Sequence, residues 1–425
     1  MTGGPRWDRR RLLRTGAAAF GGAGAGWSTS ALVAGSASAD SASGSASGSV
    51  AAPTVIAPSP GAETVPPEGN HQPGVVTPPQ AHLALVGWDL HEDATVEHLA
   101  RMMRLLSDDA RRLGQGEGAL ADTEPELAAH PSRLTVTFGF GPRVLRDLVP
   151  ASRRPALAEL PEFSRDRLRP EWGQSDVVAQ ICCDDPLTLA HARRMLVKDA
   201  RAFADVRWIQ QGFRNARGTL SQGTTMRNLM GQVDGTVNLA EAEPDFAPLV
   251  WADGTSGPEA FAGGTFLVVR RIRMQLERWD RVDRVGREAV VGRRLDTGAP
   301  LTGEAEFDEP DFEATDRFGF PVIDPASHIA RVRHTTPAER FLRRSYNYTE
   351  PDDARSSGED SGLLFLAFAA DPARQFVPVQ QRMDEVDRLN DWIVTIGSAV
   401  YAVPPAAAEG GYVGQALLEG TGEQG

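Results

Sequence analysis

The sequence predicts an α+β protein made of two ferredoxin-like units, each with an antiparallel sheet. The first observation is the order strand, helix, strand, strand, helix, strand between residues 80 and 235, which is the order of that unit. The second is that a similar order recurs between residues 236 and 415. The third is size, because 425 residues with 41% hydrophobic side chains can fill more than one core but are too few for four average domains.

Residues 1–39 are expected to be an export signal that takes no part in the fold. Arginines at 9–11 precede a mildly apolar stretch rich in Gly and Ala, and Ala-Ser-Ala at 37–39 forms a cleavage site. Paired arginines followed by two leucines are typical of twin-arginine signals. We therefore expect a secreted or extracytoplasmic protein that is exported through the twin-arginine pathway.

Residues 40–79 are rich in Ser, Ala, Gly and Pro. Such a composition buries too little apolar surface to offset the entropy lost on ordering. The sequence therefore predicts a disordered linker between the signal and the folded part.

The first unit, expected at residues 80–235, shows both periodicities of regular structure. Apolar residues recur every three or four positions between 95 and 113, which indicates a helix with one buried face. Apolar and polar residues alternate between 134 and 139, which indicates a strand. The expected elements are strand 82–88, helix 95–113, strands 134–139 and 176–183, helix 186–203 and strand 206–213.

The second unit, expected at residues 236–415, begins with a clear strand at 264–270. A helix is expected to start within 274–279, and an apolar run at 362–368 predicts another strand. The last expected helix is 378–392, which is placed to begin at a proline.

Composition excludes several classes of protein. The chain has 44 basic and 57 acidic side chains, and a net charge of −13 argues against a nucleic-acid partner, which needs a basic surface. No run of 18 apolar residues follows position 40, so no membrane span is expected in the mature chain. Lys198 is the only lysine, and no Gly-Lys-Ser/Thr occurs, which excludes a Walker-type phosphate loop. The only cysteines, Cys182 and Cys183, are adjacent strand residues and offer no disulfide framework.

Two segments carry residues suited to chemistry. Residues 231–236 read GQVDGT, and a carboxylate between glycines lies where the backbone can approach a flat ligand closely. The alternative is an ordinary Asp-Gly turn. The second segment holds His328 in PASHIAR, followed by FLRRSYNY at 341–348, and His334 is a rival for any role given to His328.

Taken together, these segments make the sequence resemble the dye-decolorizing peroxidase family. The resemblance lies in GxxDGT at 231–236, Ser-His-Ile at 327–329 and Arg-Arg-x-Tyr at 343–346. The stretches LVVRRIRM at 267–274 and GSAVYAVPP at 397–405 also look like that family. The branch it most resembles is the exported one that includes the deferrochelatase/peroxidases.

The resemblance implies haem b (iron protoporphyrin IX) in the C-terminal unit, with His328 as the axial ligand of the iron. Neutral imidazole is a usual ligand of peroxidase iron, and its second nitrogen normally donates to a carboxylate. Asp387 is the candidate for that carboxylate, and Asp384 is its rival three positions earlier.

On the other haem face, the resemblance implies an acid–base and charge pair formed by Asp234 and Arg343. Asp234 would move the proton of peroxide, and Arg343 would stabilise the developing negative oxygen. Gly235 and Thr236 are expected to border the cofactor, and Arg331 to contact it. Two departures from the family pattern occur here: Ser345 replaces the usual Gly after the paired arginines, and His-x-Arg is lengthened to His-Ile-Ala-Arg.

The expected function is a haem peroxidase that reduces hydrogen peroxide and oxidises bulky aromatic or dye-like donors. An acidic pH is favoured because aspartates stay ionised in mild acid, whereas a histidine base would be protonated. The alternative is a deferrochelatase or haem-handling protein in iron acquisition, with an iron-uptake or copper-oxidase partner. A third hypothesis, independent of the family, is an exported hydrolase that uses Asp234. A homo-oligomer is also considered.

Bulky donors cannot reach a buried haem, so aromatic side chains could relay electrons to the surface. The candidates in or near the matched segments are Tyr346, Tyr348, Trp392 and Tyr401. The alternative is that each is an ordinary core or rim aromatic.

Overall fold

The computed structural model describes residues 60–221, 223–255, 257–352 and 358–420. The expected export signal and residues 40–59 of the expected linker lie outside these ranges. Residues 60–79 differ from the prediction, because they pack onto the folded part. Val75 is 2% exposed, and the buried side chain of Gln72 donates to the carbonyls of Phe138 and Pro404, both at 2.9 Å. These contacts supply the burial that composition alone does not indicate.

The first half follows the predicted order with small shifts of the boundaries. Thr95 caps the first long helix by accepting a hydrogen bond from the amide of His98, which explains why the helix begins there. The elements are β1 (His82–Leu90), α1 (Val96–Gly114), β2 (Thr135–Phe140), α2 (Pro142–Leu148), β3 (Val177–Cys183), α3 (Pro186–Ala200) and β4 (Ala204–Phe213).

The second half holds the remaining strands and several short helices. The elements are α4 (Phe246–Val250), β5 (Thr265–Met274), α5 (Leu276–Trp279), α6 (Arg284–Val291), α7 (His328–Val332), β6 (Leu342–Arg343), β7 (Tyr346–Pro351), β8 (Glu359–Ala369), α8 (Pro372–Val386), β9 (Ile393–Val403) and α9 (Gln415–Leu418).

Helix α8 begins six residues before the predicted start at Pro378. Asp371 caps its first turn by accepting from the amides of Ala373 and Arg374, and Pro372 occupies the first turn, where proline is tolerated. Pro378 therefore lies inside the helix. The predicted start was wrong because Pro378 was taken as the first residue of the helix, although Pro372 suits the first turn equally well.

All strands of both halves belong to one antiparallel sheet in the order β5-β9-β2-β3-β1-β4-β7-β8-β6, with a further pairing of β5 with β8. The halves join where Phe140 of β2 pairs with Ala402 of β9 and where Phe213 of β4 pairs with Asn347 of β7. The antiparallel sheets expected for the two units are thus linked into one by a single residue pair at each junction. Edge strands expose unpaired backbone groups, and here the edges of the two halves pair with each other.

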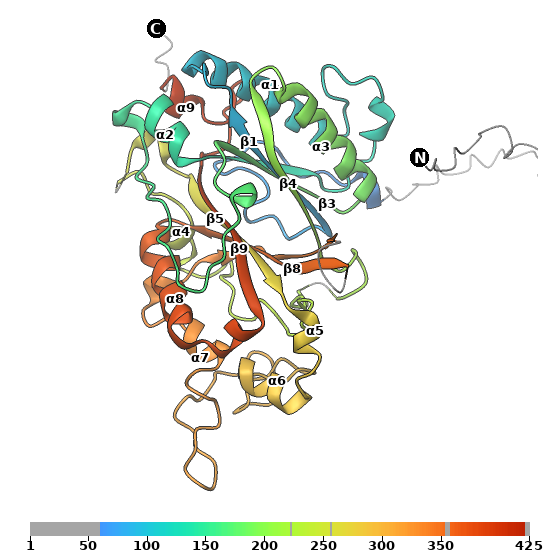
Figure 1. Cartoon of the computed structure of the whole chain (residues 1–425). Coiled ribbons are helices and arrows are strands. Elements are labelled where there is room, and N and C mark those ends of the chain that lie inside the picture. Colours follow the sequence, from blue (N-terminus) through green and yellow to red (C-terminus); the bar gives the residue numbers. More distant parts are fainter. Residues whose placement is uncertain (1–59, 222, 256, 353–357, 421–425) are drawn as a thin grey trace, which may run out of the picture. The chain divides into compact units, whose positions relative to one another are not determined.

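Two core clusters occupy the two faces of this sheet. On one face, Leu99 and Met103 of α1 and Leu196 of α3 pack against Val86 and Ile181. Figure 1 shows both helices lying together over the strands of the first half.

Between the halves, side chains of strands β1 and β3 pack against side chains of strands β5, β8 and β9. Leu85 and Val178 share a cluster with Val269, Leu364 and Tyr401. Cys182 belongs to this cluster and Cys183 to the helix-facing one, so the two free cysteines point to opposite faces, as the sequence predicted.

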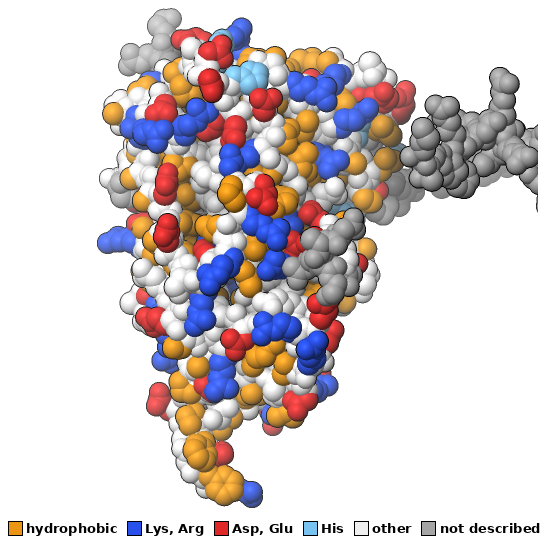
Figure 2. Space-filling view, in the orientation of Figure 1, with side chains coloured by type: hydrophobic (Ala, Val, Ile, Leu, Met, Phe, Trp, Pro, Cys, Tyr) orange, Lys and Arg blue, Asp and Glu red, His pale blue; other side chains and the backbone are white. Residues whose placement is uncertain are grey.

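Helices α6, α7 and α8 gather at the end of the second half, beside β8 and β9 (Figure 1). Phe376 of α8 packs against Val268, Ala367 and Val400 of three neighbouring strands. A long segment between α6 and α7 projects from this end, and hydrophobic side chains gather at its tip (Figures 1 and 2). Phe318, in this segment, is 69% exposed.

A buried carboxyl in the first half should make the stability depend on pH. Asp109 of α1 is fully buried and accepts from the amide of Leu120 at 2.9 Å. Burial raises the pKa of this carboxyl from 3.8 to about 7, and the nearby Asp199 contributes in the same direction.

The folded state binds the proton of Asp109 more tightly than the unfolded state does. The stability that this proton adds is therefore lost as the pH rises from about 4 to about 7. One pKa unit corresponds to about 1.4 kcal/mol, so a few kcal/mol at most are at stake. We expect Asp109→Asn to flatten this dependence, measured as melting temperatures below and above the window. An equally steep dependence in the variant would contradict the assignment.

Candidate active site

His328 begins helix α7, directly after the buried Ser327. Its Nδ1 lies 2.7 Å from Oδ2 of Asp387, and the two side chains are 25% and 0% exposed. A carboxylate only accepts hydrogen bonds, so Nδ1 carries the proton in this contact. The neutral imidazole therefore keeps its Nε2 lone pair for another partner.

Asp387 is held by its own backbone surroundings. Its second oxygen accepts from the amide of Leu389 at 2.8 Å, and the next residue, Arg388, donates its amide to the carbonyl of Ala326 at 2.9 Å. This second bond ties the segment before His328 to the end of α8. The rival Asp384 instead accepts from the amides of residues 164 and 165.

The charge on His328 reflects two opposing effects. Burial alone would lower the pKa of the imidazole, but the Asp387 carboxylate outweighs burial, so the pKa lies above its usual value. The Asp234 carboxylate raises this pKa further, whereas the Arg343 guanidinium lowers it.

Asp234 sits in a turn whose backbone requires glycine. Gly235 has a φ of +128°, a conformation that other residues rarely adopt, and a Cβ there would lie 3.3 Å from a methyl group of Thr225. The amide of Asp234 donates to the carbonyl of Met226 at 2.8 Å. Oδ2 of Asp234 accepts from the side-chain amide of Asn228 at 3.2 Å.

Arg343 faces Asp234 from strand β6. Its Nη1 lies 3.3 Å from Oδ1 of Asp234, and the side chains are 25% and 16% exposed. Asn238 holds the backbone of Arg343 on both sides, because it accepts from the Arg343 amide and donates to the Arg343 carbonyl, each at 2.8 Å. The two residues predicted as a pair are thus brought together and fixed.

The supporting residues Asn228 and Asn238 were missed from the sequence. Both lie close to the GxxDGT segment, but an asparagine in a loop has many ordinary uses in turns. Only the fold reveals that Asn238 pairs with a residue 105 positions away.

The remaining predicted site residues do not converge on this place. The hydroxyl of Thr236 donates to Glu306 at 3.0 Å. Arg331 points at α8, where it donates to the carbonyl of Arg382 at 3.0 Å and to Glu385 at 2.6 Å. The expected contact of Arg331 with the cofactor stays a prediction. His334 lies beyond the end of α7 and is exposed.

The aromatic candidates divide into two groups. Tyr346, Tyr348 and Tyr401 are at most 1% exposed and belong to the core between the halves. Trp392 is partly exposed and packs edge-to-face on Trp279 at 5.3 Å between ring centroids. Packing therefore accounts for the three tyrosines.

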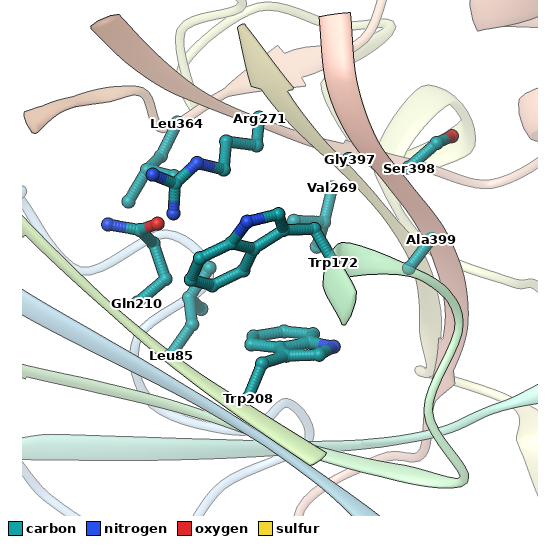
Figure 3. A pocket seen from close by; sticks show the side chains of 10 residues that line it. All are labelled: Leu85, Trp172, Trp208, Gln210, Val269, Arg271, Leu364, Gly397, Ser398 and Ala399. Carbon is teal, nitrogen blue, oxygen red and sulfur yellow. The ribbon is translucent and has the colours of Figure 1, made fainter. Parts of the chain in front are cut away.

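A small pocket lies between the two halves, and none of His328, Asp234 and Arg343 lines it (Figure 3). Its main feature is Arg271, whose guanidinium lies 3.8 Å from the ring centroid of Trp172 and 4.4 Å from that of Tyr348. Ion pairs to acidic residues at 350 and 360 complete its surroundings. This arrangement neutralises a buried charge at the junction and does not extend the site.

The donor set of the site fits haem better than a bare metal ion. Within the described ranges, no group of three or more His, Cys, Asp or Glu side chains could hold a metal. A single imidazole suits an iron that a macrocycle already holds by its other ligands. Partly exposed apolar side chains lie in the adjoining clusters, as a flat apolar ring would need: Leu229, Ile272, Phe341, Phe365 and Trp392.

Comparison with known proteins confirms the resemblance seen in the sequence. The family model described as Dyp-type peroxidase, N-terminal, matches residues 72–214, and the one described as Dyp-type peroxidase, C-terminal, matches residues 225–408. The dye-decolorizing peroxidase of Thermobifida fusca (strain YX) is 40% identical over 366 residues, which are 82% of this chain and 84% of that protein. The deferrochelatase of Escherichia coli (strain K12) is 32% identical over 386 residues, 85% of this chain and 89% of that protein.

A solved structure agrees with these relatives. The crystal structure of the DyP-type peroxidase from Cellulomonas bogoriensis has a TM-score of 0.80 and 50% sequence identity, and the match covers 85% of this chain and 100% of that one. The family models together match well over half of the chain. The protein therefore belongs to the Dyp-type peroxidase family and is a haem peroxidase, with haem b as its cofactor.

Proposed function

We propose that this peroxidase reduces hydrogen peroxide and oxidises bulky aromatic, dye-like donors, with highest activity at acidic pH. The observation that carries the proposal is the pairing of Asp234 with Arg343, in a chain whose His328 imidazole is hydrogen-bonded to a carboxylate. Bound haem supplies the iron at which peroxide is reduced. The chain's own residues bind that iron, hold protons and carry fixed charge.

His328 and Asp387 form the half of the site that holds the cofactor. The proton on Nδ1 fixes the ring and leaves Nε2 as the atom that would bind iron. The Asp387 carboxylate makes the imidazole more electron-donating. Ser327 lies directly before His328 and is fully buried, which fixes the start of α7. The bond to Asp387 fixes the imidazole ring.

Asp234 and Arg343 form the half of the site that acts on peroxide. With haem bound, the Asp234 carboxylate would accept the proton from one peroxide oxygen and return it to the other, which would leave as water, while the haem would supply the two electrons for the reduction. Arg343 cannot lose its proton, so its charge stabilises the oxygen on which negative charge develops. A carboxylate base stays ionised in mild acid, where a histidine base would be protonated, and this supports an acidic optimum.

We also propose that the cofactor belongs to the second of two ferredoxin-like units, spanning about 236–415 after a first unit at 80–235. The strands of the second half pair in the order β9-β5-β8-β7, and those of the first half in the order β4-β1-β3-β2. These two orders correspond strand for strand, which supports a common unit. His328, Arg343 and Asp387 all lie in the second.

A second candidate function is removal of iron from haem, because several relatives at 32–33% identity are deferrochelatases. The same ligand set would serve it, with an iron-uptake system or a copper oxidase as partner. The proposed self-association into a homo-oligomer is compatible with either function.

The two functions are separated by following dye and porphyrin in one reaction. With hydrogen peroxide and an anthraquinone dye, we expect peroxide-dependent loss of dye colour while the haem keeps its iron. Metal-free porphyrin is fluorescent, so fluorescence that rises together with released iron, without dye turnover, would favour the second candidate. A sample without peroxide is the control.

We further propose that the protein is exported through the twin-arginine pathway before it acts. No helix within the described part of the chain has the length and hydropathy to cross a membrane. Replacing the arginines at 9–11 by lysine keeps the charge but removes the signal, and we expect the protein to stay in the cytoplasm. Fractionation and immunoblotting measure this. Undiminished export of the triple variant would contradict the proposal, whereas a variant at Arg14 alone is the matched control.

A further inference from the structure

A wide groove lies away from His328, Asp234 and Arg343, where four segments of the chain meet. It is lined by residues at 69–71, 247–248, 251–253, 262–263, 405–406 and 408, and its volume is about 720 Å³. A volume of this order accommodates a small organic molecule. None of the motifs used for the peroxide reaction contributes to its walls.

The groove is built in advance of any ligand. The amide of Gly263 donates to the carbonyl of Ala252, and the amide of Ala252 donates to the carbonyl of Gly264, both at 2.8 Å. Gln72 joins the first segment to the last through the carbonyl of Pro404 at 2.9 Å. Gly263 has a φ of +78°, and a Cβ on it would lie 3.1 Å from the carbonyl oxygen of Asn70, so a larger residue would not fit between these two segments.

An aromatic pair forms one wall of the groove. The rings of His71 and Trp251 stack with centroids 3.6 Å apart and planes 6° apart, and both side chains are partly exposed. Stacked rings of this kind present a flat surface on which a planar ligand can lie.

The imidazole of His71 is oriented by its hydrogen bond. Nδ1 lies 2.7 Å from the carbonyl oxygen of Gly263, which can only accept, so Nδ1 carries the proton. In the neutral ring, Nε2 is then an acceptor. Because His71 lines the groove, Nε2 is the acceptor that this imidazole can offer to a ligand there.

The remaining walls limit the chemistry of a ligand further. They are mostly Ala and Pro side chains, which favour an apolar ring: Ala247, Pro248, Ala252, Ala262, Pro405, Ala406 and Ala408. The carboxylate of Asp253 also borders the groove, where it accepts from the amide and hydroxyl of Thr255 at 2.9 and 2.7 Å. Its negative charge disfavours an anionic ligand.

We propose that this groove binds a neutral planar phenol, which donates its hydroxyl to Nε2 of His71 and packs against the His71–Trp251 wall. The inference rests on the proposed function in one respect: an enzyme that oxidises aromatic donors would use a site that binds a phenol. The binding itself needs neither peroxide nor turnover.

The test compares guaiacol with veratrole, its methyl ether, which keeps the ring but lacks the hydroxyl donor. Dissociation constants are measured by isothermal titration calorimetry on the resting haem protein. We expect guaiacol to bind about 5-fold more tightly, the effect of one hydrogen bond. His71→Phe should keep the aromatic wall and abolish the preference, whereas Trp251→Ala should weaken both ligands. Phe318→Ala, at the exposed tip of another segment, is the control and should change neither.

Two further variants separate this proposal from the proposed function. Asp253→Asn should improve binding of vanillate, which is guaiacol with a carboxylate, without changing guaiacol. Asp234→Asn should slow the peroxide reaction and leave guaiacol affinity intact. A guaiacol preference that survives His71→Phe, or binding that is unaffected by both His71→Phe and Trp251→Ala, would overturn the groove assignment while leaving the peroxide chemistry untouched.

Discussion

His328→Ala is expected to yield protein with little or no haem. In the proposed site the imidazole supplies the protein's bond to the iron, so its removal leaves the iron without that ligand. The measurement is the ratio of haem absorption to protein absorption after purification, together with the iron content. Activity with peroxide should fall in proportion to the lost haem.

Two variants serve as controls for this loss. His334→Ala should keep full haem content, because His334 is exposed and lies beyond α7. Asp387→Asn should keep most of the haem but shift its absorption spectrum and reduction potential, because a neutral amide makes the imidazole a weaker electron donor. Normal haem in His328→Ala, combined with its loss in His334→Ala, would show that the wrong histidine had been assigned.

Arg343→Leu is expected to slow the reaction with hydrogen peroxide more than Asp234→Asn does. Removing a fixed charge that stabilises a developing anion typically costs about 10²- to 10³-fold. Asp234→Asn removes the proton acceptor, but a water molecule can carry a proton in its place, so the loss should be about 10-fold to 100-fold. The clamp of Asn238 on both backbone groups of Arg343 supports this ranking, because it fixes the guanidinium relative to its partner.

The ranking is measured by mixing each protein rapidly with peroxide and following the haem spectrum at matched haem content. Arg317→Leu, on an exposed segment, is the matched control and should react at the wild-type rate. A wild-type rate for Arg343→Leu beside a slow Asp234→Asn would reverse the ranking. If neither variant reacts more slowly, the pair does not act on peroxide.

Local patterns predicted the elements well where one periodicity dominated. The helix from Val96 and the strands of the first half lie close to their expected positions, since their apolar residues repeat at a single spacing. The start of α8 was misplaced because two prolines six residues apart both suit a first turn. The joining of both halves into one sheet could not be predicted, because it depends on single pairings between distant strands.

The sequence motifs identified the individual site residues but not how these residues lie relative to one another. Asp234, Arg343, His328 and Asp387 come from four separate segments, and the structure brings them together as two contacting pairs. Spacing alone does not separate Asp387 from Asp384, because residues three positions apart share a face wherever both belong to a helix. The fold separates them, since α8 ends at Val386 and Asp387 turns to cap the next turn.

Two of the predicted site residues bond protein partners that the sequence did not indicate. Arg331 finds Glu385 and a backbone carbonyl of α8, and Thr236 finds Glu306. Residues 60–79 gain order from long-range contacts such as that of Gln72 with Pro404, which no composition reveals. In each case the deciding partner lies far away along the chain.

The identity of the iron-binding nitrogen is the claim on which the rest depends. It is tested most directly by electron paramagnetic resonance of the ferrous protein with bound nitric oxide, in which an axial imidazole nitrogen adds its own splitting to that of nitric oxide. We predict this added splitting in the wild type and in His334→Ala, and its absence from His328→Ala that has been reconstituted with haem. Splitting that persists in His328→Ala, or disappears in His334→Ala, would contradict the assignment of His328 as the ligand.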